Sequence, residues 1–293
     1  YCINNCMSLK SDAQRQRLAS LKHLLLWEGR LNRARLQEIF DLGPVRASQW
    51  IREFREQNPG LTTWDSKARS FMAAPEAYRA KRSVNRHQDD AASLAQYLAL
   101  VGLPHAAAGL EPGRGLWAAF PDLSVPNPRI FAILSESIRS HMAVQITYRS
   151  MRDPAPHQRV ISPHSLVRAG RRWHVRAFCQ SNQDFRDYAL GRIAEVKLLN
   201  TPAERVAQDD VAWMTPVRVR LVAHPDLTPE QDDLIRFEYF SNTSARVETC
   251  RGALVGYFLQ DMRAATDTKQ QRPPDYQLAV DNINEVRPWL FPV

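Results

Sequence analysis

The feature that most constrains the fold is a segment whose two faces differ in character. Residues 171–178 are mostly β-forming types, and successive side chains along a strand point to opposite sides. One side of this strand carries Trp173, Val175 and Ala177, and the other carries His174 and Arg176. Such a strand is typical of one wall of a small β-barrel whose cationic face meets a negatively charged group.

Cationic residues continue on both sides of this strand. From Ala143 to Asn200 the chain has nine arginines and one lysine against four acidic residues. Arginine is favoured over lysine where a planar, bidentate donor must recognise phosphate or carboxylate. We therefore expect a pocket for an anionic ligand, with a solvated barrel surface as the alternative. The expected ligand-binding residues are Ser150, Arg152, Arg159, His164, His174, Arg176, Arg186 and Arg192.

The order of four short motifs resembles the WYL domain of bacterial transcriptional regulators. These motifs are Tyr148-Arg-Ser150, Arg159 to Leu166, Trp173-His-Val175 and Arg186 to Ile193. The resemblance implies a five-stranded, Sm-like barrel with a basic, ligand-sensing pocket. The name-giving Trp-Tyr-Leu triplet is altered, because His174 replaces Tyr and Val175 replaces Leu. Trp173 and Val175 keep the apolar face, whereas the change at His174 leaves the identity of the ligand open.

Three helices are expected in the N-terminal part of the chain. They cover residues 12–27, 33–41 and 44–57, with Asp12, Asn32 and Pro44 at their starts. A tight Leu42-Gly43 turn joins the last two, which is the helix-turn-helix pattern. Two short strands at 61–64 and 69–72 follow and predict a β-wing. The alternative is a basic helical bundle that contacts protein.

The third helix is expected to present a polar face to DNA. Val45, Ile51 and Phe54 would hold it on the domain core, and Trp50 would help. Arginine can read guanine edges and glutamine can read adenine edges in the major groove, while wing cations bind phosphate. The expected DNA-binding residues are Arg46, Ser48, Gln49, Arg52 and Arg55 on the helix and Lys67 and Arg69 on the wing.

The charge of the chain is unevenly distributed. Residues 1–83 contain 15 basic and 8 acidic residues, residues 84–200 contain 14 and 9, and residues 201–293 contain 10 and 14. A basic front half and an acidic C-terminal part favour a polyanionic partner at the N-terminus.

The whole chain is expected to be an α+β multidomain protein. Helices are expected over 89–101, from Pro128 to Met142, from a Thr228 cap, and from Ala253 to Ala265, with strands at 144–148, 215–224, 247–251 and 277–280. The expected domains are a winged helix-turn-helix at 8–83, a helical connector at 84–128, a WYL barrel with its preceding helix at 129–200, and a small α+β extension with a possible dimerisation role at 201–293.

Several classes of protein are disfavoured. No GxGxxG, phosphate loop, HExxH or CxxC pattern is present, so we expect no enzyme, no cofactor and no metal. A site built from Ser162, His164 and Asp153 stays open, although no spacing places them together. The four cysteines lack paired spacing and there is no run of 18 apolar residues, so we expect a reduced, cytoplasmic protein that is not inserted in a membrane.

The leading hypothesis is a homodimeric, sequence-specific DNA-binding repressor that recognises an inverted-repeat operator. The resemblance extends to regulators of BREX and CBASS phage-defence operons, and it implies an anionic effector such as a nucleotide or an oligonucleotide. The alternative is an accessory nucleic-acid-binding subunit that stimulates a partner enzyme. Protection of a discrete palindrome would favour the repressor, and equal affinity for any nucleic acid would favour the accessory subunit.

Overall fold

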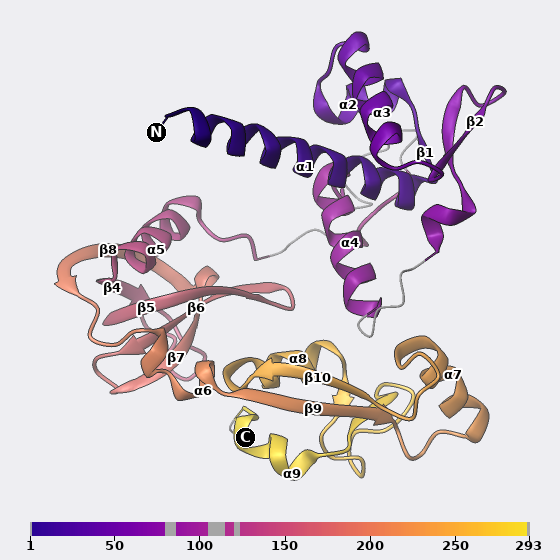
Figure 1. Cartoon of the computed structure of the whole chain (residues 1–293). Coiled ribbons are helices and arrows are strands. Elements are labelled where there is room, and N and C mark those ends of the chain that lie inside the picture. The colour runs from indigo at the N-terminus through magenta and orange to yellow at the C-terminus, as the bar shows by residue number, and fades with distance from the viewer. Residues whose placement is uncertain (1, 80–85, 105–114, 120–123, 292–293) are drawn as a thin grey trace. The chain divides into compact units, whose positions relative to one another are not determined.

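The computed structural model describes residues 2–79, 86–104, 115–119 and 124–291, which form two units (Figure 1). Unit 1 spans residues 1–121 and unit 2 spans residues 122–293. Within the described residues, no helix is long and apolar enough to cross a membrane.

Unit 1 is a winged helix-turn-helix domain that consists of four α-helices and a small β-sheet, among the residues that the structure describes. The three-stranded wing sheet has the order β1-β3-β2, with antiparallel pairing throughout. Its elements are α1 (Cys2–Glu28), β1 (Arg30–Leu31), α2 (Arg33–Phe40), α3 (Pro44–Gln57), β2 (Thr62–Asp65), β3 (Ser70–Ala73) and α4 (Arg86–Val101).

The first helix begins well before the expected cap. The chain is already helical from Cys2, so the prediction that Asp12 caps this helix is wrong. No proline or glycine occurs between Cys2 and Asp12, and no residue type there would stop a helix. The Asp12 carboxylate instead pairs with Arg15, one turn further along.

A compact apolar core holds α3 in place. Ala47, Ile51 and Phe54 recur at the helical period and are buried against leucines of α1 and α2. Val45 was expected on this stripe, but its side chain is 83% exposed. Val45 precedes Ala47 by two residues, and this spacing places it on the opposite side of the helix. Trp50 is half-buried and packs on the rim of the core beside Phe40.

The helix that was expected inside the connector belongs to unit 1. The Trp27 and Tyr97 rings stack with centroids 6.3 Å apart, and the Trp27 indole Nε1 donates to the Ser93 hydroxyl at 3.0 Å. The Tyr97 hydroxyl also donates to Glu28 at 3.4 Å. The prediction of a helix from residue 89 to Val101 is confirmed, and α4 begins three residues earlier, at Arg86.

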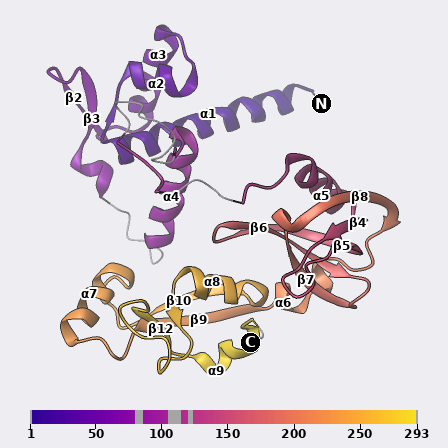
Figure 2. The same ribbon diagram turned by 180° about the vertical axis from the view of Figure 1, so that it is seen from behind.

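Unit 2 begins with a five-stranded antiparallel sheet at the place where a five-stranded, Sm-like barrel was expected. Its order is β7-β6-β5-β4-β8, so β7 and β8 are its two ends (Figure 2). The elements are α5 (Pro128–Ser140), β4 (Met142–Tyr148), β5 (His157–Ala169), β6 (Arg172–Cys179), β7 (Asp184–Ala189) and β8 (Ile193–Pro202).

Helix α5 covers the apolar face of this sheet. The Asn127 side chain caps it by accepting from the backbone of Arg129 and Ile130, and Ile130 and Leu134 are buried against the sheet. The helix ends at Ser140, two residues before the expected end. His141 adopts a left-handed conformation that stops the helix, and Met142 already belongs to β4.

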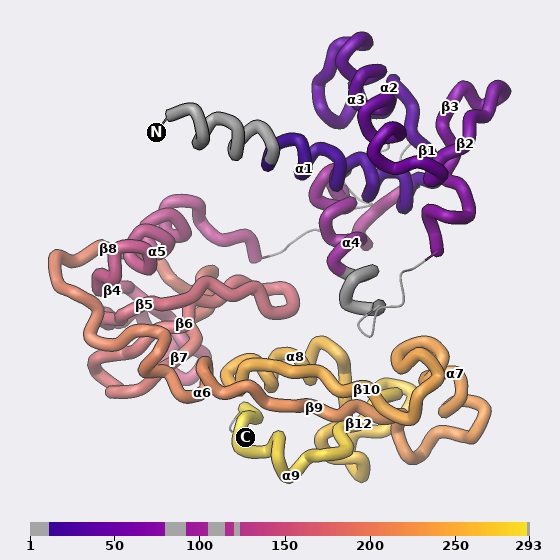
Figure 3. Tube along the Cα trace, viewed as in Figure 1, coloured from indigo at the N-terminus to yellow at the C-terminus, as the bar shows by residue number. Residues whose placement is uncertain are grey.

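The C-terminal part of unit 2 is the expected α+β domain, as the chain trace in Figure 3 shows. Its four-stranded sheet has the order β10-β9-β12-β11. The elements are α6 (Val211–Met214), β9 (Pro216–Ala223), α7 (Pro229–Tyr239), β10 (Arg246–Arg251), α8 (Val255–Asp261), β11 (Ala264–Ala265), β12 (Leu278–Val280) and α9 (Ile283–Val286).

Local signals placed most of these elements correctly. Val217, Val219 and Leu221 of β9 are buried on one side, and Thr228 forms the capping box of α7 with Gln231. The expected helix from Ala253 to Ala265 is wrong in extent. Arg263 has a φ of 47°, which ends the helical stretch and lets Ala264–Ala265 pair in parallel with β12.

Candidate nucleic-acid interface and ligand site

The outer face of α3 carries all five residues that were expected there, three arginines and two uncharged polar residues. Pro44 occupies the first turn, where its missing N–H costs nothing, and Gly43 precedes it in extended conformation. The buried stripe then turns the opposite face of the helix to solvent. The exposed residues on it are Arg46, Ser48, Gln49, Arg52 and Arg55.

These five side chains differ in how free they are. The Gln49 amide donates to Glu53 at 2.8 Å, and the Ser48 hydroxyl donates to the Pro44 carbonyl at 3.0 Å. Among the residues that the structure describes, no hydrogen bond or ion pair is formed by the side chain of Arg46 or Arg52. These two arginines are therefore the cations of α3 that are ready to bind an anion or a base edge.

Arg55 connects α3 to the wing. Its guanidinium lies over the Phe71 ring of β3, 4.2 Å from the ring centroid, and the Trp64 ring of β2 lies 4.8 Å from the Phe71 ring. Stacking fixes a guanidinium plane without using its hydrogen-bond donors. Arg55 can thus hold the wing and still donate to a phosphate.

The turn of the wing presents its two cations to solvent. The Asp65 carboxylate accepts from the backbone N–H groups of Lys67 and Ala68 at 2.8 and 2.9 Å, which folds the turn tightly. Lys67 and Arg69 are both exposed, and Arg69 adopts a left-handed φ of 50°. Helix and wing therefore present cations from two separate segments of unit 1.

A hollow of about 510 Å³ lies at the N-terminal half of α3 and includes two residues that the sequence argument missed. It is lined by Ser48, Gln49 and Arg52 from the expected set, together with Pro44, Arg33 and Val45. Arg33 is the first residue of α2, directly after the Asn32 cap. A cation at this position, which the sequence alone locates, could have been included among the expected DNA-binding residues. Val45 was missed because an apolar residue was assigned to the core.

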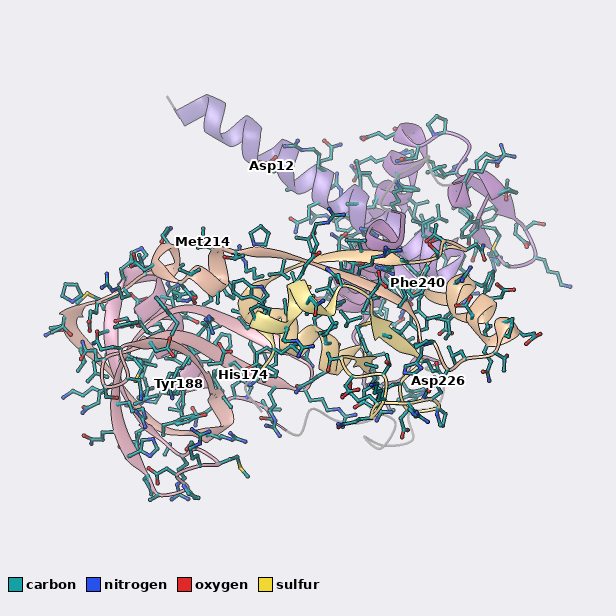
Figure 4. All side chains as sticks on the ribbon, turned by 90° about the horizontal axis from the view of Figure 1, so that it is seen from below. Asp12, His174, Tyr188, Met214, Asp226 and Phe240 are labelled. Atoms are coloured by element: carbon teal, nitrogen blue, oxygen red, sulfur yellow. The ribbon has the colours of Figure 1, made fainter. Side chains whose placement is uncertain are left out.

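The expected ligand residues fall on both faces of the barrel sheet rather than on one. The register pairs Val175 with Tyr188 and Ala177 with Arg186, so Arg186 shares the side of the apolar core. Arg159 pairs with Ile146 and lies on that same side, toward the sheet edge. His174 and Arg176 lie on the opposite side (Figure 4 labels His174 and Tyr188).

On the core side, Arg159 closes over a buried thiol. Its guanidinium donates to Asn182 at 2.8 Å and to Ser181 at 3.0 Å, and its Nη1 lies 3.9 Å from the Cys179 Sγ. Burial raises the pKa of Cys179, but hydrogen bonds from its polar neighbours, Ser181 first, outweigh this and lower the pKa. The Tyr188 hydroxyl is buried here, and burial raises its pKa.

On the opposite side, His174 lies near two arginines and contacts an aromatic residue of the C-terminal domain. The ring lies 5.0 Å from Tyr257 of α8, and the Tyr257 hydroxyl donates to Asp187 at 3.2 Å. Burial lowers the pKa of His174, and the charges of Arg172 and Arg192 lower it further against the opposing effect of Asp187. The histidine is therefore neutral at neutral pH, and its buried Nδ1 has no partner among the described residues.

Arg176 is buried and engaged by two carboxylates. Its Nε and Nη2 donate to Asp210 at 2.6 and 3.0 Å, and its Nη1 donates to Asp187 at 3.2 Å. His164 also contacts Asp210, with 3.1 Å between Nε2 and Oδ2. Burial would raise the pKa of Asp210, but the hydrogen bonds from His164 and Arg176 hold it well below its ordinary value. A ligand would have to displace a carboxylate to reach the Arg176 guanidinium.

The remaining expected residues lie in or near surface turns. The Ser150 hydroxyl accepts from the Asp153 backbone N–H at 2.8 Å and so closes the turn between β4 and β5. Arg152 is exposed in that turn, and the Arg186 guanidinium, half-exposed, lies 3.9 Å from Asp184. The Arg149 N–H donates to the Arg192 carbonyl at 3.1 Å, which places this turn next to Arg192.

No arrangement of a Ser, a His and an Asp for catalysis is formed by the residues considered from the sequence. The Ser162 hydroxyl accepts from the Glu204 backbone N–H at 2.8 Å, and His164 contacts Asp210 instead of Asp153. Among the described residues, no group of three or more His, Cys, Asp or Glu side chains could hold a metal ion. A hollow of about 430 Å³ in unit 2 is lined mainly by residues of α5, β4, β5 and β8 and includes no residue of the expected ligand set.

Three family models match the chain in the order of its domains. They are described as the BrxR transcriptional regulator winged helix-turn-helix domain, over residues 13–85, the WYL domain, over 129–198, and the BrxR transcriptional regulator C-terminal dimerization domain, over 216–286. A solved structure of the proteasome accessory factor B/C of Arthrobacter aurescens aligns with 88% of this chain and 44% of that one, at 14% identity and a TM-score of 0.26.

Three relatives are each described as the DNA-binding transcriptional repressor CapW. The Pseudomonas aeruginosa protein is 32% identical, with 94% of this chain and 91% of the relative covered. The Stenotrophomonas maltophilia protein is 29% identical (94% and 92%), and that of Escherichia coli strain KTE188 is 30% identical (93% and 90%). The chain therefore belongs to the family of transcriptional regulators that contains the CapW repressors, with a BrxR-type winged helix-turn-helix, a WYL domain and a C-terminal dimerization domain.

Proposed function

We propose that this protein is a homodimeric DNA-binding transcriptional repressor. The observation that carries the proposal is the exposed pair Arg46 and Arg52 on α3, neither of which has a partner among the described residues. A recognition helix needs such donors for base edges, and the wing cations Lys67 and Arg69 supply phosphate contacts from a second segment. The description of the relatives as repressors supports this function over the accessory-subunit alternative.

The test of DNA recognition is a footprint on the region upstream of the protein's own gene. A homodimer should protect two half-sites related by a two-fold axis and separated by whole helical turns, about 34–36 Å centre to centre. Equal affinity for unrelated DNA or RNA at the same salt concentration would refute sequence-specific repression. Salt must be matched, because phosphate contacts make all affinities salt-dependent.

Base reading and phosphate binding can be separated by substitution. Arg46→Ala or Arg52→Ala should weaken operator binding by about 1–3 kcal/mol and relax sequence preference. Lys67→Ala should instead weaken operator and unrelated DNA alike and reduce the slope of affinity against salt concentration. Operator affinity that is unchanged in both arginine variants would remove the assignment of α3 as the recognition helix.

The WYL barrel is proposed to sense an anionic effector, a nucleotide or a nucleic-acid fragment, at the side of the sheet that carries His174. The support is the group of Arg172, Arg192 and neutral His174 around a buried, unpartnered ring nitrogen. A phosphate would supply both the negative charge and the hydrogen-bond acceptor that this group lacks. The resemblance to BREX and CBASS regulators further favours an operon for phage defence as the target.

The sensing proposal has its own test. His174→Ala or Arg192→Ala should leave operator binding intact and abolish the release of DNA by the effector, with nucleotides and short oligonucleotides as the probes. Release requires that the effector prefer a dimer geometry in which the two recognition helices no longer match the operator spacing. Loss of basal operator binding in either variant would instead mean that the barrel itself binds DNA.

A further inference from the structure

Two large apolar side chains of helix α7 in the C-terminal domain are exposed to solvent. Leu234 is 60% exposed and Phe237 is 69% exposed, and a spacing of three residues places them side by side on one face of the helix. The other face holds Ile235, which is 4% exposed, against the core of the domain. The core cluster of the domain includes Ile235 but neither Leu234 nor Phe237.

The position of this pair within the chain indicates what covers it. Among the described residues, the large apolar side chains that are exposed within residues 216–286 are Leu234, Phe237 and Val247. That range is the one matched by the model of a dimerization domain, and α7 alone brings two of these residues together. Adjoining exposed apolar side chains of this size are typical of an interaction surface.

We propose that the face of α7 formed by Leu234 and Phe237 packs against the same face of a second copy of this chain. The inference rests on the proposed homodimer and adds the surface that forms it. A two-fold axis through the contact makes it isologous, so each copy contributes the same residues, and burial of both pairs removes them from water together.

The charge around this pair predicts an unusual salt response. Glu230, Asp233 and Glu238 are exposed on α7 around Leu234 and Phe237. A symmetric contact brings the same acidic rim from both copies, and salt screens the resulting repulsion. The dimer should therefore become tighter as salt concentration rises, whereas binding to DNA should become weaker.

The experiment measures the dimer dissociation constant of the full-length chain by analytical ultracentrifugation. Phe237→Ala should raise this constant by about 100-fold, since a loss of about tenfold occurs once in each copy. Leu234→Ala should act in the same direction. Val247→Ala is the matched control, because Val247 is an exposed apolar residue of the same domain on β10, and it should leave the constant unchanged.

The outcomes separate this proposal from the proposed function. A wild-type chain that is monomeric at every concentration would refute the homodimer itself. A dimeric wild type whose dissociation constant is the same in Phe237→Ala, or changes as much in Val247→Ala, would overturn the α7 surface alone. A wild-type dimer that weakens with added salt would also overturn it. Phe237→Ala should retain the helical content of the wild type, which circular dichroism checks, because both α7 side chains lie outside the core.

Discussion

The buried ion pair between Arg176 and Asp210 is the contact whose loss should cost most in unit 2. The side chains are 9% and 2% exposed, and the pair is bidentate, with distances of 2.6 and 3.0 Å. Arg176→Met keeps the length and volume of the stem but leaves the Asp210 carboxylate buried without its guanidinium partner, with the His164 ring and the Trp213 backbone N–H as its remaining contacts. Removal of one member of a buried pair costs about 3–5 kcal/mol, mainly because the other charge is left uncompensated.

The uncompensated Asp210 carboxylate also determines the stability of the double variant and the dependence of stability on pH. Arg176→Met combined with Asp210→Asn removes both charges, so it should recover part of the loss, with a coupling of about 0.5–3 kcal/mol. The pKa of Asp210 is lower in the folded chain than in the unfolded chain, so the unfolded chain binds more protons in acid. The stabilising contribution is therefore complete above the ordinary aspartate pKa of about 3.9 and is lost as pH falls below it.

Urea unfolding followed by tryptophan fluorescence would measure these changes, since the Trp213 backbone N–H donates to Asp210. Hydrogen exchange of β6 and of residues 207–214 would show that the loss is local to this contact, which matters in a chain of several domains. A cost below about 1 kcal/mol for Arg176→Met would refute the reasoning. So would a double variant that is less stable than the single one.

Four further predictions address separate parts of the molecule. Val45, 83% exposed in the hollow on α3, should contact a thymine methyl group; replacing operator thymines by uracil should then lower the affinity of the wild type and leave that of Val45→Ala unchanged. An anion bound at His174 should raise the lowered pKa of its imidazole, so effector affinity measured by calorimetry should increase from pH 8 to pH 6, and His174→Asn should abolish that increase. Tyr257→Phe loses the hydrogen bond to Asp187 but keeps the ring beside His174, so the effector should still bind while DNA release is reduced in a gel-shift titration. Gly252→Ala places a Cβ 2.3 Å from the Trp289 ring and should lower the free energy of unfolding by about 1–3 kcal/mol, measured with urea. Gly60→Ala meets no neighbour, but its φ of 84° should strain the backbone without a clash.

Local signals predicted much of the fold, because they act within a few residues. Pro44 and the Asn58-Pro59-Gly60 break bound α3 at the expected residues, and the Thr228-Pro229 start of α7 needed only its own capping box. The errors concern contacts between residues that are far apart in the sequence, which a local pattern cannot predict. Strand alternation placed His174 and Arg176 together correctly, yet it could not reveal Asp210, a buried partner 34 residues away in a short linker. Arg176, one of the residues expected to bind a ligand, is thus buried against two carboxylates.

The position of Asp210 gives the WYL domain a direct connection to the C-terminal domain. Asp210 caps α6, which leads into β9, and its carboxylate accepts from Arg176 of β6. Two residues before Arg176 on the same face, His174 touches Tyr257 of α8, and Asp187 accepts from both Arg176 and Tyr257. An anion at His174 would therefore compete electrostatically with Asp187 for the nearby arginines. It would thereby alter the hydrogen bonds that Asp187 accepts from Arg176 and from Tyr257 of the C-terminal domain. If that domain forms the dimer and the proposed effector binds at His174, the effector site and the spacing of the proposed recognition helices would be coupled through carboxylates rather than through the apolar core.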